Sequence, residues 1–92
     1  MAISRVKNIV FQKLHNRAWG EADDDTIYID PRAKGKKLME TAHHEMLHVI
    51  FPDMDEKTVM LAAKELTRNM WKLHYRRIDN DTSQPLQTLK QC

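Results

Sequence analysis

The chain has 92 residues, a length that fits one small domain and makes a second domain very improbable. Fifteen Lys and Arg residues against 13 Asp and Glu residues give a formal net charge of +2, which is too small to indicate nucleic-acid binding by itself. The single cysteine, Cys92, excludes a disulfide framework and a multi-cysteine zinc site within these residues. No apolar run is long enough for a signal peptide or a membrane span, so we expect a cytoplasmic protein.

Two extended segments are predicted in the first part of the chain. Residues 6–14 are rich in β-branched and aromatic side chains and predict a strand. Their apolar positions also fit a short helix with Ser4 as its N-cap, so both alternatives stay open. Residues 18–22 predict a second extended segment, in which Gly20 would permit close backbone approach.

A turn, a strand and a basic loop follow. Residues 23–25 are three aspartates, which is typical of a turn, and the alternation of residues 26–30 predicts a half-buried strand. We therefore expect a hairpin. Residues 31–37 contain four cations that could bind phosphate or an acidic partner, although solvation is the preferred interpretation. These cations are Arg32, Lys34, Lys36 and Lys37.

Two helices are predicted in the second half. The first begins near Lys37 and ends at Phe51, because Pro52 cannot continue it. Asp55 is a good N-cap for a second helix from Glu56 to about residue 76, and the short connection predicts antiparallel packing. The apolar positions of the two helices are Leu38, Met39, Ala42, Met46, Val49 and Ile50, then Val59, Ala63, Leu66, Met70 and Leu73. We assign residues 1–78 to one domain and residues 79–92 to a mobile tail.

The first helix contains the pattern His44-Glu45-Met46-Leu47-His48. Positions four apart on an α-helix differ by about 40° around its axis, so His44 and His48 can reach one metal ion. Glu45 is turned about 100° from His44, which suits a general base that activates water better than it suits a ligand. His43 is turned more than about 100° from the mean of the two histidines, and we expect it at the surface.

A catalytic zinc site usually needs a third protein ligand. The second helix offers Glu56 and Glu65, and Glu56 lies nearer to its apolar face, so Glu56 is the preferred ligand. Glu65, Asp53 and Asp55 remain alternatives. His15 and His74 are weaker candidates. The aromatic residues Trp19, Tyr28, Trp71 and Tyr75 are assigned to the core, although Tyr75 or His74 could instead stabilise an oxyanion.

The arrangement resembles a minimal zincin of the gluzincin type, and more narrowly the IrrE/ImmA-like and small phage-associated HExxH metallopeptidase-like proteins. The resemblance covers residues 19–77 and rests on a strand ending in Ile-Asp-Pro-Arg, a basic loop, the His44 to His48 motif and an acidic start to the next helix. It implies zinc on His44 and His48, Glu45 as general base and a glutamate of the next helix as third ligand. Leu47 stands where IrrE/ImmA-like proteins commonly carry glycine.

These patterns together predict an α+β fold, in which a small antiparallel sheet of two or three strands packs on the motif helix and on a second long antiparallel helix. The leading functional hypothesis is a zinc-dependent metallopeptidase that hydrolyses a peptide or protein substrate, with Glu45 as catalytic base and His44, His48 and Glu56 as ligands. One alternative is a non-catalytic interaction module with a structural zinc ion. Another is a nucleic-acid-binding module that uses Lys34, Lys36, Lys37, Arg76 and Arg77.

Overall fold

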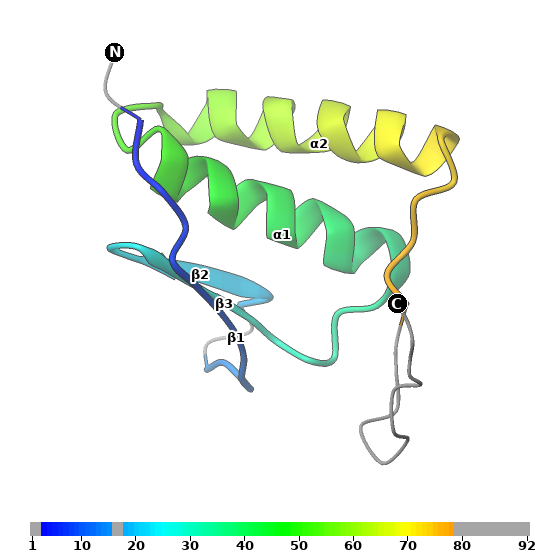
Figure 1. The fold of residues 1–92 in the computed structure, drawn as a ribbon, viewed down its shortest axis with the longest axis horizontal. Coiled ribbons are helices and arrows are strands. Elements are labelled where there is room, and N and C mark those ends of the chain that lie inside the picture. The colour runs from blue at the N-terminus through cyan, green and yellow to red at the C-terminus, as the bar shows by residue number, and fades with distance from the viewer. Residues whose placement is uncertain (1–2, 16–17, 79–92) are drawn as a thin grey trace.

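The computed structural model describes residues 3–15 and 18–78, so the tail predicted for residues 79–92 lies outside the described residues. The elements are β1 (Asn8–Phe11), β2 (Gly20–Asp23), β3 (Thr26–Ile29), α1 (Gly35–Ile50) and α2 (Glu56–Lys72). They form three layers, with the sheet on one side of α1 and α2 on the other (Figure 1). The expected α+β class and the antiparallel helix pair are therefore observed, and α1 is the element that contacts both other layers.

The sheet is mixed, which corrects the prediction of a purely antiparallel sheet. Its strand order is β1-β3-β2, and β2 pairs antiparallel with β3 as the expected hairpin. β1 pairs with the other edge of β3 and runs parallel to it. The prediction was wrong because strand propensity shows that a segment is extended but not which edge it joins. The helix considered for residues 6–14 does not form, and the strand there is four residues long.

Asp24 and Asp30 fix the ends of the hairpin. Asp24 lies in the turn with φ of 57°, a left-handed conformation that aspartate tolerates better than most residues. Asp30 follows β3 and is fully buried, where its carboxylate accepts hydrogen bonds from the backbone N–H of Leu14 and from the backbone and guanidinium of Arg32. The Arg32 side chain and these N–H groups hold the pKa of Asp30 well below its usual range. The buried carboxylate therefore ties the segment after β1 to the end of β3.

Three faces of α1 meet three different surroundings. Leu38 and Val49 are buried against Ile27 and Ile29 of β3, which forms the larger core cluster. Leu47 is buried on another face against two residues of α2, Val59 and Ala63. A leucine at this position thus fills the helix–helix contact, where glycine would leave a gap. The third face of α1 carries His44 and His48, which are partly exposed and meet Glu56 at the start of α2.

The two ends of α2 have defined caps. Asp55 accepts hydrogen bonds from the backbone N–H and the hydroxyl of Thr58, as expected for an N-cap. The helix ends at Lys72, about one turn earlier than predicted, because His74 adopts φ of 68° and the N–H of Tyr75 bonds to the carbonyl of Met70. This is the Schellman arrangement that terminates helices. Neither helix in the described part of the chain has the length and apolar content of a membrane span.

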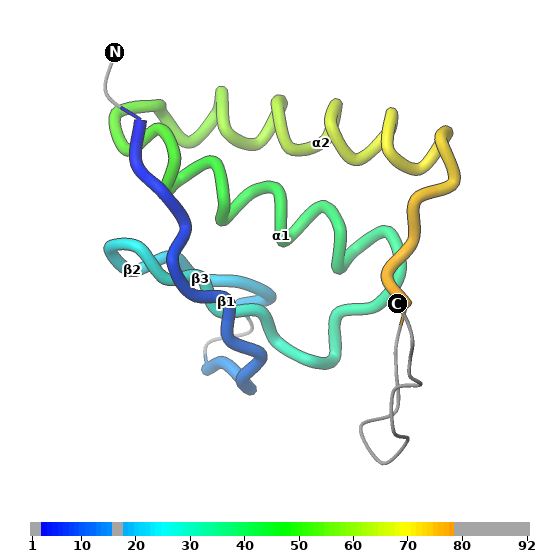
Figure 2. Tube along the Cα trace, in the orientation of Figure 1, coloured from blue at the N-terminus to red at the C-terminus, as the bar shows by residue number. Residues whose placement is uncertain are grey.

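The segment before β1 crosses the end of α1. The N–H of Ser4 donates to the carbonyl of Ile50 at 3.0 Å, and the N–H of Lys7 donates to the carbonyl of Asp25 at 2.8 Å. Figure 2 shows this segment running from the C-terminal end of α1 down to the sheet. These contacts hold the sheet and the last turn of α1 together at the end of the molecule that carries His48.

Candidate metal centre

His44 and His48 project from the third face of α1. They are one helical turn apart, their ring centroids are 5.0 Å apart, and both side chains are partly exposed. The helix geometry that the spacing predicts is therefore present, with Leu38 and Val49 on the sheet side anchoring the helix. Both Nε2 atoms point toward the start of α2.

Glu56, the first residue of α2, bridges the two histidines. Its Oε2 lies 2.9 Å from Nε2 of His44, and its Oε1 lies 2.8 Å from Nε2 of His48. Asp55 fixes the start of α2 directly before it, so the turn after α1 delivers Glu56 to this place. The structure thus brings together the three residues that the sequence predicts as metal ligands, His44, His48 and Glu56.

These three side chains, called the metal group below, could hold a metal ion. One ligand atom from each can be chosen so that all three lie within 4.8 Å of one another. Around a tetrahedral zinc ion with bonds of about 2.0–2.1 Å, neighbouring ligand atoms are about 3.3 Å apart. The separations of 2.9 and 2.8 Å are a few tenths of an ångström shorter and involve the two different oxygens of Glu56, so the carboxylate would have to shift outward slightly to bind an ion. Its side chain is 67% exposed, which leaves that movement unobstructed.

Glu45 lies beside this group and is partly buried under β2. Burial raises the pKa of Glu45, an effect that His44 and His48 oppose and that Glu56 and Glu21 reinforce. A carboxyl group whose pKa is raised is a stronger base once it is ionised, which is the property that general-base catalysis uses. Glu45 is therefore placed next to the candidate ligands without being one of them.

Gly20 at the start of β2 allows this close packing. A Cβ atom at residue 20 would lie 2.6 Å from the Cγ2 atom of Thr41 and 2.8 Å from the Cγ atom of Glu45. Real Cβ atoms do not approach other atoms this closely, so only glycine fits without displacement. The close approach expected at Gly20 is thus observed, and the contact is with the side chain of the predicted catalytic base.

Two hollows flank Glu45 and share it. One, of about 650 Å³, is lined by Ser4, Glu21, Ala22, Asp24, His48, Val49 and Pro52 in addition to Gly20 and Glu45. The other, of about 200 Å³, lies toward the N-terminus of α1. Both hollows include Gly20 and Glu45, so they lie along the border between β2 and α1 on either side of the close contact between these two residues.

Trp19 lines the smaller hollow, which corrects its assignment to the core. It is 41% exposed and has two cations near its ring, with Arg32 Cζ at 5.8 Å and Lys37 Nζ at 5.9 Å from the ring centroid. From the sequence, Trp19 is assigned to the core, and Lys37 is considered only as one of the cations that could bind phosphate, an acidic partner or nucleic acid. The spacing does contain a signal for Lys37, because it precedes His44 by two helical turns and so lies on the same face.

His43 faces α2, which corrects the expectation of a surface histidine. Its Nδ1 lies 2.8 Å from the hydroxyl of Thr67, which is 1% exposed, and burial lowers the pKa of His43. The residue therefore connects α1 to α2 and takes no part in the metal group.

The remaining ligand candidates have other roles or lie elsewhere. Glu65 is engaged by Arg68 and Asn69 on the outer side of α2, and these contacts lower its pKa. Asp55 caps α2, and Asp53 is exposed in the turn. Neither belongs to the metal group that the described residues form. His74 follows the far end of α2, about 27 Å along the helix from Glu56.

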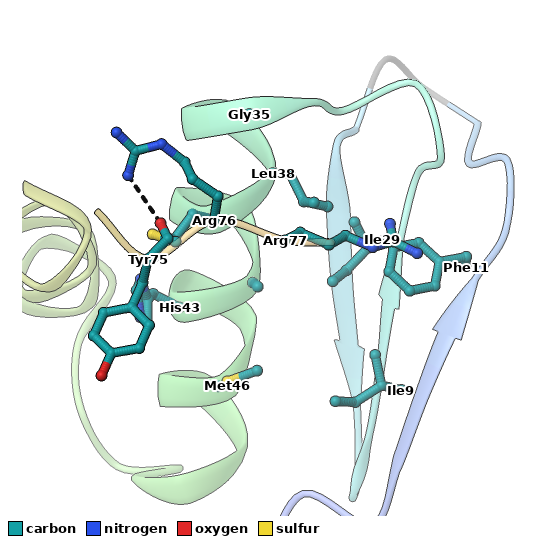
Figure 3. Close-up of a pocket in the computed structure, with 12 residues that line it drawn as sticks. Ile9, Phe11, Ile29, Gly35, Leu38, His43, Met46, Tyr75, Arg76 and Arg77 are labelled. Atoms are coloured by element: carbon teal, nitrogen blue, oxygen red, sulfur yellow. Dashed lines mark hydrogen bonds between the residues drawn. The ribbon is translucent and has the colours of Figure 1, made fainter. Parts of the chain in front are cut away.

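An apolar cavity of about 420 Å³ lies on the sheet-facing side of α1. Figure 3 shows it between α1, β1 and the segment after α2, with Tyr75 and Arg77 at its edge. The guanidinium of Arg77 lies 4.3 Å from the ring centroid of Phe11. His44, Glu45, His48 and Glu56 do not line this cavity, so Tyr75 is remote from the metal group and cannot stabilise charge there.

Comparisons of the chain with models of known protein families, with curated proteins and with solved structures give no match.

Proposed function

We propose that this protein is a zinc-dependent peptidase of minimal zincin type. The observation that carries the proposal is that ligand atoms of His44, His48 and Glu56 lie within 4.8 Å of one another, with Glu45 beside them lining two hollows. Two imidazoles and one carboxylate form a donor set that zinc favours, and three protein ligands leave a fourth position free for catalysis. Among the described residues, the group that could hold a metal contains no fourth side chain, which also supports an open site.

In the proposed reaction, zinc supplies a Lewis acid that polarises the scissile carbonyl and makes water more acidic. Glu45 takes a proton from the attacking water and later donates it to the leaving amine. Its position next to His44 and His48 suits this role, because the group must lie within reach of the reacting atoms without binding the metal. Partial burial beneath Gly20 restricts the movement of the carboxylate.

β2 offers a way to align a peptide beside α1. β3 is paired on both sides, by β1 and by β2, so its backbone groups are occupied. β2 is paired only with β3 among the described strands, and its other edge runs along the larger hollow beside α1. An extended substrate could pair with this edge through main-chain hydrogen bonds, as peptides do at other exposed strands.

A metal and cleavage assay tests the proposal. Purified protein should bind one zinc ion per chain and cleave members of a mixed-sequence peptide library, with cleavage sites read by mass spectrometry. Glu45→Gln is the matched control, because it keeps the shape of the side chain and the ligands but loses the base. We expect it to bind zinc normally and to lower kcat by about 100-fold or more.

The alternative of a structural metal ion predicts a different pattern. If zinc only joins α1 to α2, Glu45→Gln changes nothing measurable, while His44→Ala lowers the unfolding temperature of the zinc-loaded protein. A zinc-loaded wild type that cleaves no peptide in the library would contradict the proposed peptidase. A protein that binds no zinc would contradict both functions.

A further inference from the structure

The smaller hollow beside Glu45 contains a lysine, Lys37, that the proposed function does not explain. It lies between Trp19 and α1 and is lined by Ala18, Trp19, Gly20, Lys37, Glu40, Thr41, His44 and Glu45. Its volume of about 200 Å³ is below the roughly 300–1,000 Å³ of pockets that hold drug-sized ligands. It is therefore of a size to receive one side chain or one chain end rather than a separate cofactor.

Lys37 is the cation that lines this hollow, together with the carboxylates of Glu40 and Glu45. Glu40 is paired with Lys64 at 3.1 Å, and Arg32 is paired with the buried carboxylate of Asp30 at 2.7 Å. No described carboxylate lies within 4.0 Å of the Lys37 ammonium group. Trp19 stands beside this ammonium and offers an apolar wall. A cation next to an aromatic wall favours a ligand that carries a carboxylate on a short apolar stem.

The distance from the metal group sets where that carboxylate sits. Lys37 and His44 lie on the same face of α1, seven residues or about 10.5 Å apart along the axis. An extended peptide advances about 3.3 Å per residue, so Lys37 is about three residues from the reacting carbonyl.

The direction of the substrate follows from β2. Antiparallel pairing is slightly the more stable mode, and a peptide antiparallel to β2 has its C-terminal part toward Trp19. Residues after the cleaved bond then pass Lys37. Given the proposed function, on which this inference rests, we propose that the hollow formed by Trp19 and Lys37 is a carboxylate subsite. It selects substrates with a carboxylate about three residues C-terminal to the cleaved bond.

The carboxylate of the substrate could come from two sources. One is an Asp or Glu side chain, in which case the enzyme cuts within chains before acidic residues. The other is the terminal carboxylate of the substrate, in which case the enzyme removes short C-terminal pieces. Peptides that carry Glu or Gln at each of the three positions after the cleaved bond, each with a free or an amidated C-terminus, separate these sources.

The test uses both cleavage and binding. The zinc-loaded wild type should cleave peptides with the carboxylate at least about tenfold faster, measured as kcat/KM, than their neutral counterparts, which corresponds to about 1.4 kcal/mol. Lys37→Met should bring this ratio close to one, and Lys37→Glu should reverse it in favour of Lys-containing peptides. Lys36→Met is the matched control, because Lys36 is the neighbouring exposed lysine and does not line the hollow.

Binding of the same peptides to zinc-loaded Glu45→Gln, measured by calorimetry, separates this inference from the proposed reaction. A preference for carboxylate peptides that Lys37→Met abolishes would support the subsite even if wild type cleaves nothing. Equal binding and equal cleavage of charged and neutral peptides would overturn the subsite while leaving the peptidase intact. Absence of both binding and cleavage would overturn both.

Discussion

Neighbouring histidines on α1 occupy two regions with opposite properties. His44 lines the smaller hollow, and its Nε2 meets Glu56 at the start of α2. His43 faces α2, where its Nδ1 meets the buried hydroxyl of Thr67. One side of the helix is thus available to a metal and a substrate, while the side next to it holds the two helices together. His43 and His44 are the same residue type, so their different roles follow from the directions in which they point from the axis of α1.

The different roles of His44 and His43 are tested most directly by replacing each of them with alanine. We expect His44→Ala to lower zinc affinity by more than about 100-fold. Loss of a residue that only hydrogen-bonds to a metal ligand already lowers metal affinity by about 10–100-fold. We expect His43→Ala to keep zinc affinity and to lower the free energy of unfolding by about 1–3 kcal/mol, because the Thr67 hydroxyl loses its partner. Zinc titration with a competing chelator and urea unfolding of the metal-free proteins measure the two effects. Equal zinc loss in both variants would contradict the separation of the two faces.

The same comparison extends to the two glutamates of α2. Glu56→Gln should weaken zinc binding by on the order of 10–100-fold, because the amide keeps the shape of the carboxylate but loses its charge. Glu65→Gln is the matched control on the same helix and should leave zinc affinity unchanged. If Glu65→Gln weakens zinc binding as much as Glu56→Gln does, the third ligand is assigned to the wrong residue.

On the side of α1 that faces β2, Gly20→Ala tests how closely the two elements pack. The added Cβ overlaps Thr41 and Glu45, and overpacking of this kind costs about 1–3 kcal/mol of the free energy of unfolding. Zinc affinity should stay within about twofold, while any cleavage activity falls because Glu45 is displaced. Adding Thr41→Ser removes the methyl group that lies 2.6 Å away and should restore part of the stability. Unchanged stability of Gly20→Ala would show that β2 is farther from α1 than this geometry requires.

On the α2 side, the smallest expected effect is that of Thr67→Val. The change keeps the side-chain shape and removes the hydroxyl next to His43, at a cost of about 1 kcal/mol. A double-mutant cycle with His43→Ala, followed by urea unfolding, should give a coupling energy of about 0.5 kcal/mol or more. Additive losses would mean that the two residues contribute independently. Zinc affinity serves as the control and should not change.

Much of this arrangement could be predicted from the sequence because it depends on local spacing. The four-residue spacing of His44 and His48, the stop at Pro52 and the cap at Asp55 each act within one or two turns. They were sufficient to predict both helices and to favour Glu56 over Glu65. The hairpin of β2 and β3 could also be predicted, because three aspartates typical of a turn separate two short extended segments.

The parts that could not be predicted depend on contacts between distant segments. The parallel pairing of β1 with β3 is set where Asp30 accepts the N–H of Leu14, which no short pattern encodes. Trp19 is an apolar residue that composition assigns to the core, and only the approach of β2 to α1 brings it to the smaller hollow. His43 was misplaced because its partner, Thr67, belongs to the other helix.

The position of Glu56 at the first turn of α2 has a consequence for folding. All three candidate ligands lie in the α1–α2 hairpin, so the loop that must close to assemble them is short and its entropic cost is small. Contacts that are local in sequence form quickly, whereas the parallel pairing of β1 requires a longer search. The metal group can therefore assemble before the sheet docks, and an ion captured at that stage would stabilise the helical hairpin by mass action.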